Sequence, residues 1–138
     1  MNNVFANLNW LGVFLAFVVY FILGALWFTL FFTRSYRISL GRANETLKNN
    51  APIFIAGPAV CSLVITIASA VLMNALDIRT LSEALTFAGI AGFGYLFANT
   101  VNIAINPNIP RPILYGIITG SYHLSGMVIV STLLFFTR

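Results

Sequence analysis

The amino-acid sequence predicts an all-α membrane protein, an antiparallel bundle of four transmembrane helices. The first observation behind this prediction is composition. Hydrophobic residues make up 59% of the 138 residues and charged residues 7%, whereas soluble domains carry about 25% charged residues. The second is that the hydrophobic residues gather in four long runs. A helix needs about 20 apolar residues to cross a hydrocarbon core about 30 Å thick.

The four runs form a single transmembrane domain over residues 1–138, with short hairpins between them. Each run is several times longer than a typical strand, so buried strands do not explain the pattern. The predicted spans cover residues 10–32, 52–76, 85–105 and 112–136.

Residues at the ends of the runs support these boundaries. Trp10 and Trp27 stand near opposite ends of the first span, as aromatic residues do at the two membrane interfaces. Ser82 followed by Glu83 is expected to cap the third span. Three prolines in residues 106–112 forbid a continuous helix and predict a stiff hairpin. The polar loop 33–51 has room for a short surface helix.

Basic residues predict the orientation. Cytoplasmic loops are rich in Lys and Arg, and five of the seven such residues lie in loops 33–51 and 106–111, against Arg79 and Arg138 on the other face. Both loops are therefore predicted to be cytoplasmic and both termini outside. This orientation explains the net charge of +4, and there is no basic, aromatic-interleaved surface for nucleic acid. The five loop residues are Arg34, Arg37, Arg42, Lys48 and Arg111.

Three short motifs carry a resemblance to a known family. Residues 9–11 read NWL, residues 24–27 read GALW and residues 122–124 read YHL. Together with the four-span layout, they resemble a family of small bacterial membrane proteins catalogued as a domain of unknown function. Phe28 and Ser121 depart from the usual pattern, which has tyrosine and an uninterrupted Gly-Tyr-His there. The resemblance covers essentially the whole chain and implies the four-helix fold and the bacterial cytoplasmic (inner) membrane, but no catalytic residues.

Catalytic chemistry finds little support in the sequence. The acidic residues Glu45, Asp77 and Glu83 lie in loops or at span ends, so paired-carboxylate chemistry within the bilayer is removed and a carboxylate proton relay is disfavoured. Cys61 and His123 are the only cysteine and histidine, too few for a metal site in one chain. We therefore predict no metal and no cofactor, and we rank an enzyme last.

Small residues share faces of the first and last spans. Gly12, Ala16 and Gly24 lie on one face of the first, and Gly116 and Gly120 form a GxxxG pair in the last. Small residues at this spacing let helices approach closely in lipid. Packing within one bundle is favoured, and a subunit interface is the alternative. Because these faces exceed what one bundle needs, we also predict a homo-oligomer, with a dimer favoured by closed symmetry.

Polar residues inside the third and last spans predict a cluster. Tyr95 and Asn99 are four residues apart, as are Thr119 and His123, so each pair shares a helix face. Counted from the proline-rich hairpin, Tyr95 and His123 lie at one depth and Asn99 and Thr119 at another. An unpaired amide in hydrocarbon costs on the order of 2–7 kcal/mol. The four side chains are therefore predicted to form one buried cluster that could touch a ligand.

Three classes of function stay open. The favoured class is binding or permeation of a small molecule, ion or lipid at the polar cluster, within an oligomer. The second is an accessory or structural subunit that packs against a membrane partner. The third is a small enzyme acting on lipid or quinone, which lacks a nucleophile–base pair in the sequence. A continuous polar cavity would favour the first class, and a dry core with a large apolar outer face would favour the second.

Overall fold

The computed structural model describes residues 5–45 and 51–138, which are all-helical apart from short turns. Four continuous helical stretches, Trp10–Phe31, Ile53–Ala75, Leu81–Ala104 and Pro112–Phe136, are long and apolar enough to cross a membrane. They confirm the predicted fold class. The elements in chain order are η1 (Phe5–Asn7), α1 (Trp10–Leu26), η2 (Trp27–Phe31), α2 (Thr33–Ser39), α3 (Ile53–Ala75), α4 (Leu81–Gly89), η3 (Ile90–Phe97), α5 (Ala98–Ala104) and α6 (Pro112–Phe136).

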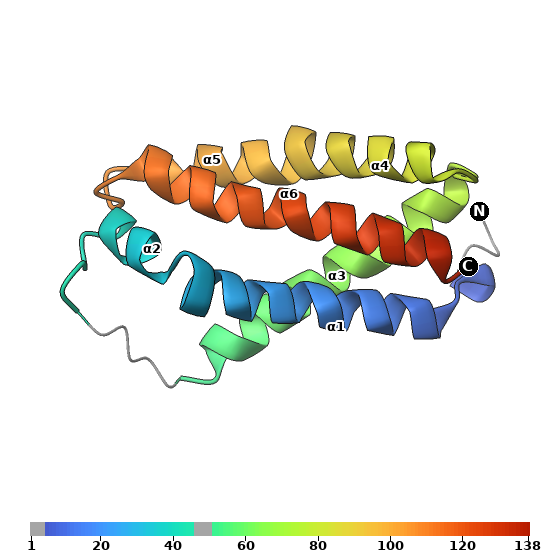
Figure 1. Ribbon diagram of the computed structural model, residues 1–138, viewed down its shortest axis with the longest axis horizontal. Coiled ribbons are helices and arrows are strands. Elements are labelled where there is room, and N and C mark those ends of the chain that lie inside the picture. Colours follow the sequence, from blue (N-terminus) through green and yellow to red (C-terminus); the bar gives the residue numbers. More distant parts are fainter. Residues whose placement is uncertain (1–4, 46–50) are drawn as a thin grey trace.

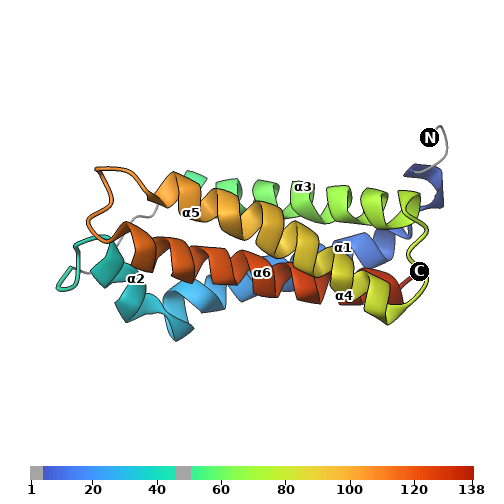
Figure 2. The same ribbon diagram turned by 90° about the horizontal axis from the view of Figure 1, so that it is seen from above.

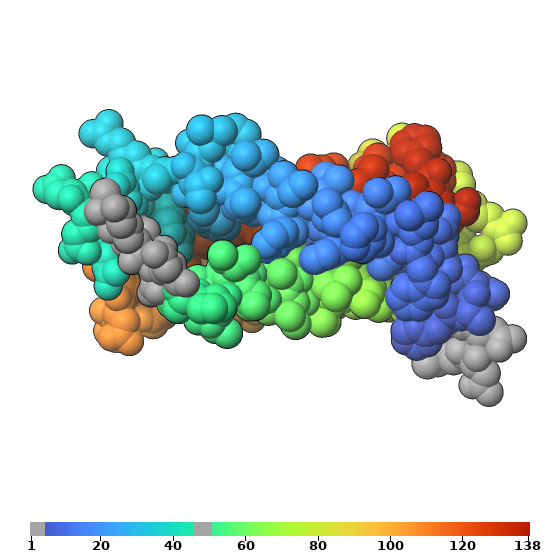
Figure 3. Space-filling model, turned by 90° about the horizontal axis from the view of Figure 1, so that it is seen from below, coloured from blue at the N-terminus to red at the C-terminus, as the bar shows by residue number. Residues whose placement is uncertain are grey.

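The last helix, α6, is the centre of the bundle. It lies between α1 on one side and the α4–η3–α5 span on the other, while α3 crosses behind this layer (Figure 1). Of its apolar stretch 39% is buried, against 22% in each other span. Seen from above, α3 and the α4–α5 span cross at an angle and diverge toward the α4 end (Figure 2). On the face seen from below, α3 lies beside α1 (Figure 3).

The two ends of the described chain meet at one end of the bundle (Figure 1). Asn9 is the N-cap of α1, because its side chain accepts hydrogen bonds from the backbone of Leu11 and Gly12. The same side chain donates to the carbonyl of Thr137, after the end of α6. A Cβ on Gly12 would lie 2.2 Å from the Thr137 hydroxyl, so only glycine fits there. The NWL motif thus ties the first span to the last.

The third span begins at Leu81, four residues before its predicted start. Thr80, rather than Ser82, is the N-cap, so the predicted cap is wrong by two residues. The Thr80 hydroxyl accepts from the backbone N–H of Glu83 at 3.2 Å, and the Glu83 carboxylate accepts from the backbone N–H of Thr80 at 3.0 Å. This reciprocal capping box satisfies two backbone groups that an isolated helix end leaves without partners.

At the opposite end, the proline hairpin docks on α2, the short helix expected in loop 33–51. The backbone N–H of Arg111 donates to the Ser39 carbonyl at 3.2 Å. Gly41 has a φ of +71°, and a Cβ there would lie 3.1 Å from the Pro110 ring. Among the predicted cytoplasmic cations, Lys48 lies outside the described residues. Which face of the membrane this end occupies stays a prediction.

Among the described residues outside the spans, Tyr36, Asp77 and Arg79 have shifted pKa values. Arg79 Nε lies 2.9 Å from both carboxylate oxygens of Asp77, and this hydrogen bond holds the pKa of the carboxyl below its usual range. Burial, with a smaller contribution from nearby Tyr115, raises the pKa of the Tyr36 phenol to about 12. The Tyr36 phenol therefore stays neutral throughout the physiological pH range.

Candidate functional site

The structure does not bring the four predicted site residues into one cluster. Tyr95 is 71% exposed on η3, and Asn99 is exposed on α5. Thr119 is buried, but its hydroxyl donates to the Tyr115 carbonyl on its own helix at 2.7 Å. His123 bonds to a residue of α1 instead. The predicted buried cluster of these four residues is therefore wrong for the monomer.

The rotation of the third span explains this outcome. It packs on α6 through Gly92, Phe97 and Val101, whose contacts include two glycines of α6. A Cβ on Gly120 would lie 2.7 Å from the Phe97 ring, and one on Gly116 would lie 3.1 Å from Val101 Cα. Burying this apolar face turns Tyr95 and Asn99 outward.

A tyrosine–histidine pair lies between α1 and α6 near the middle of both spans. The Tyr20 hydroxyl and His123 Nδ1 are 2.6 Å apart and share a hydrogen bond. Tyr20 is fully buried. The tautomer of His123 sets the direction of this bond: when the phenol donates, the proton of the neutral imidazole is on Nε2. Sequence reasoning missed Tyr20, although it shares a helix face with Gly24 and has a depth similar to that of His123.

Gly126 makes room for Tyr20, and Gly24 makes room for the neighbouring Tyr122. A Cβ on Gly126 would lie 2.1 Å from the Tyr20 ring, so the glycine is what lets Tyr20 enter the interface. Tyr122 stacks on Tyr20 with ring centroids 5.2 Å apart. Its hydroxyl would lie 2.9 Å from a Cβ on Gly24.

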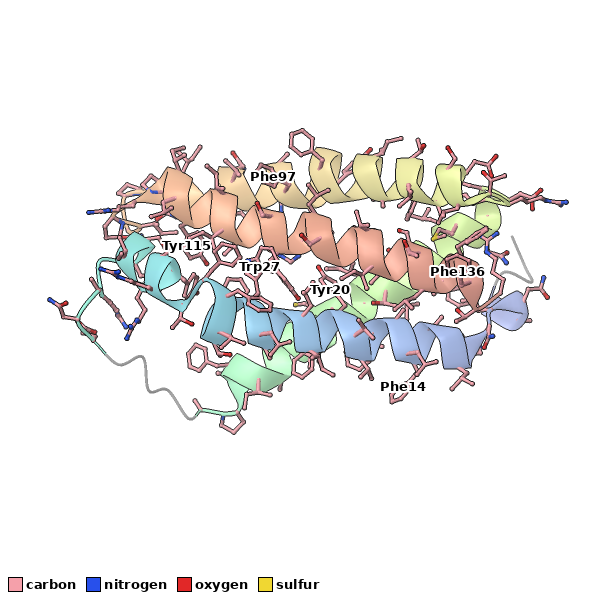
Figure 4. The ribbon with its side chains drawn as sticks, viewed as in Figure 1. Phe14, Tyr20, Trp27, Phe97, Tyr115 and Phe136 are labelled. Carbon is pink, nitrogen blue, oxygen red and sulfur yellow. The ribbon has the colours of Figure 1, made fainter. Side chains whose placement is uncertain are left out.

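Trp27, the tryptophan of the GALW motif, packs at the same interface. Trp27 Nε1 donates to the Ile118 carbonyl of α6 at 3.0 Å. Tyr20 of α1 and Trp27 of η2 point toward α6, whereas Phe14 points away from the bundle (Figure 4). The GALW and YHL motifs therefore meet across one helix pair and fix its register.

All five small residues predicted to pack helices lie inside the bundle. Ala16 is fully buried. The four glycines face side chains of other elements, so their presence gives no reason for a subunit interface. Taken in chain order, Gly12, Gly24, Gly116 and Gly120 face Thr137, Tyr122, Val101 and Phe97.

A groove opens between α3 and the α4–η3 segment. Its volume is about 620 Å³. Met127 of α6 lines it together with side chains of α3 and α4–η3, and the Ser69 hydroxyl lies 3.8 Å from the Met127 sulfur. The apolar walls come mainly from Ile65, Ala68, Leu72, Phe87, Ile90 and Leu96. The η3 segment beside the groove is π-helical over eight residues, Ile90–Phe97.

Polar groups stand near the two ends of this groove. Ser82, Glu83 and Thr86 lie in the first turns of α4, and Tyr95 lies near the middle of the span. A smaller cavity of about 160 Å³ lies where the chain ends meet, beside Asn9. Among residues 5–45 and 51–138, no three His, Cys, Asp or Glu side chains gather as a metal site would require.

The fold and these sites define a small four-span membrane protein with a polar pair buried between its first and last spans. The chain belongs to DUF1761, a family described as proteins of unknown function, whose sequence pattern matches residues 11–135. This match confirms the resemblance that the sequence motifs carry. No curated protein and no solved structure matches the chain significantly.

Proposed function

We propose that this protein binds a lipid-like molecule, with an apolar chain and a polar head, in the groove between α3 and α4–η3. The observation that carries the proposal is the groove itself. Its volume of about 620 Å³ lies within the range of about 300–1,000 Å³ that is typical of ligand sites. It lies between two spans, so a ligand can enter sideways from the hydrocarbon.

The length of the groove fits one leaflet of the bilayer. From Ser82 to Tyr95 the helix rises about 20 Å at ~1.5 Å per residue. One leaflet contributes about 15 Å of hydrocarbon, half of the ~30 Å core, plus its interface. The polar end at Ser82 and Glu83 would lie at the headgroups and the apolar walls among the acyl chains. The Glu83 carboxylate suits a head that carries hydrogen-bond donors, such as a hydroxyl or an ammonium group.

The polar groups of α3 favour binding over permeation. The hydroxyls of Ser62, Thr66 and Ser69 donate to carbonyls three or four residues back on their own helix, at 2.8–3.0 Å. Hydroxyls bonded in this way offer few free groups to a water-filled path.

An enzyme would need a nucleophile and a base within reach of each other. Of the polar side chains that line the groove, Glu83 already accepts from two backbone N–H groups.

The predicted orientation indicates which leaflet would hold the polar end of the groove. The five-to-two bias of Lys and Arg supports outside termini and a bacterial cytoplasmic membrane location. The polar end of the groove would then lie in the outer leaflet. Labelling of a cysteine placed at Asn44 from outside intact cells would reverse this assignment.

A photoreactive phospholipid tests the groove directly. In vesicles that contain a phospholipid with a diazirine on its acyl chain, this lipid should cross-link to wild-type protein within α3 and α4–η3. Ala68→Trp should lower this labelling several-fold, since Ala68 lines the groove and is exposed, so a larger ring fills the groove without entering the core. The matched control is Ala56→Trp on the same helix, where the alanine is exposed outside the groove. Equal labelling of the two variants would overturn the proposal.

A further inference from the structure

We propose that a second copy of the chain packs on the outer face of the third span and forms a two-fold dimer. The observation is a polar stripe made of Asn99 and Asn102, which continues the line of Tyr95, a residue that also lines one end of the groove. All three are exposed, and none of their side chains forms a hydrogen bond with any part of the chain that the structure describes. This span forms one edge of the layer, with no described element on its outer side (Figure 1).

Depth makes the exposure unfavourable in a monomer. The span ends at Ala104, so Asn99 lies about 8 Å and Tyr95 about 14 Å inside that end at ~1.5 Å per residue. Tyr95 is therefore close to the middle of the bilayer, too deep for its hydroxyl to reach water. Hydrocarbon offers the amide and the hydroxyl no partner. Polar side chains within spans almost always face protein or a water-filled cavity.

Small residues beside the stripe leave room for another helix. A Cβ on Gly94 would have no neighbour within 4 Å, unlike the glycines that face other elements inside the bundle. Ala98, four residues further, is also exposed. Small residues four apart let two backbones approach closely enough for side chains such as Asn99 to bond across the interface.

The chemistry of the stripe suits a copy of itself. Two copies in one membrane share an orientation, so a two-fold axis along the membrane normal brings residues of equal depth together. Asn99 would then face Asn99 of the second copy. An asparagine amide has both donors and an acceptor, so two facing amides satisfy each other reciprocally. An interface built this way needs no other polar partner.

The test measures dimerisation in lipid vesicles by energy transfer between labelled chains. Asn99→Leu should weaken dimerisation roughly eight-fold, because it removes two interhelical hydrogen bonds of the modest strength usual in membranes. The matched control is Asn74→Leu, an exposed asparagine on α3 far from the stripe, which should leave dimerisation unchanged. In a Cys61→Ser background, Asn99→Cys should form an intermolecular disulfide on oxidation. Neither Asn99 nor Asn102 lines the groove, so lipid labelling should persist in Asn99→Leu.

Each other outcome counts against the second copy. A wild-type protein that stays monomeric in vesicles at high protein-to-lipid ratio overturns the proposal. So does a dimer that survives Asn99→Leu unchanged and cross-links only elsewhere. A different membrane protein that co-purifies with the wild type and is lost with Asn99→Leu would overturn the second copy as the occupant. Unchanged helicity and thermal stability of Asn99→Leu exclude misfolding as the reason for lost dimerisation.

Discussion

The α1–α6 interface and the exposed side of η3 each hold a tyrosine near the middle of a span. Tyr20 is fully buried and bonded to His123, whereas Tyr95 is 71% exposed and has no hydrogen-bond partner among the described residues. The difference comes from the neighbouring small residues. Gly126 opposes Tyr20 and admits its ring, while η3 places Gly92 against α6 and turns Tyr95 outward. In lipid, therefore, the positions of glycines decide which polar groups are satisfied within the chain.

Of the substitutions predicted here, filling the space beside Tyr20 should lower the free energy of unfolding the most. Gly126→Ala places a methyl group 2.1 Å from the Tyr20 ring, and a buried tyrosine in a packed interface cannot move aside easily. Overpacking should lower the free energy of unfolding by about 3 kcal/mol, the upper part of the usual range. Denaturant titration in mild detergent, followed by circular dichroism, measures this change.

Gly57→Ala is the control for this substitution. Gly57 is also inside a helix, and a Cβ there would have no neighbour within 4 Å. Alanine is the better helix former, so the control should be neutral or stabilise by up to about 1 kcal/mol. If Gly126→Ala were equally harmless, the tight fit between α1 and α6 would be wrong.

Deleting one hydroxyl from each region sharpens the comparison. Tyr20→Phe leaves Nδ1 of His123 without its partner, so the free energy of unfolding should fall by about 1–2 kcal/mol. Tyr95→Phe removes the same atom from an exposed ring without a described partner. Stability of the monomer should then change by less than about 0.5 kcal/mol. Thermal unfolding of both variants in dilute detergent gives the two values, and equal losses would contradict the assignment.

The sequence could predict the spans but not the partner of His123. Hydrophobic length alone defines a membrane span, and the depth of a residue follows from a constant rise per residue. Depth, however, places both Tyr20 and Tyr95 within reach of His123. The choice between them depends on helix rotation, which the fit of Gly126 and Gly92 against their neighbours sets. No periodicity in a nearly uniformly apolar helix reveals that rotation.

The groove was also beyond prediction from sequence. It depends on how far α3 leans away from α4–η3, and α3 packs instead on α1 and α6. Its lining residues are ordinary apolar side chains such as Ala68 and Leu72, which look the same whether they face lipid, a ligand or a neighbouring helix. The small residues of the first and last spans were chosen from their spacing, but the spacing could not tell which helix each would face.

A smaller loss of stability than that of Tyr20→Phe is expected at the membrane face, where water competes for polar groups. Thr80 forms the capping box of α4 with Glu83, so Thr80→Ala removes an acceptor for the Glu83 backbone N–H. Because this helix end is exposed, the loss should be near the low end of the usual range for caps, about 0.5–1 kcal/mol.

Ser82→Ala separates the two candidate caps of α4. Ser82 was predicted as the cap, but the structure places it inside the first turn, where alanine is the better helix former. Ser82→Ala should therefore leave stability unchanged or slightly raised, measured beside Thr80→Ala in the same thermal unfolding series. If Ser82→Ala were the costlier change, the third span would begin later than Leu81. The polar end of the groove, which depends on that first turn, would then lie at a different depth.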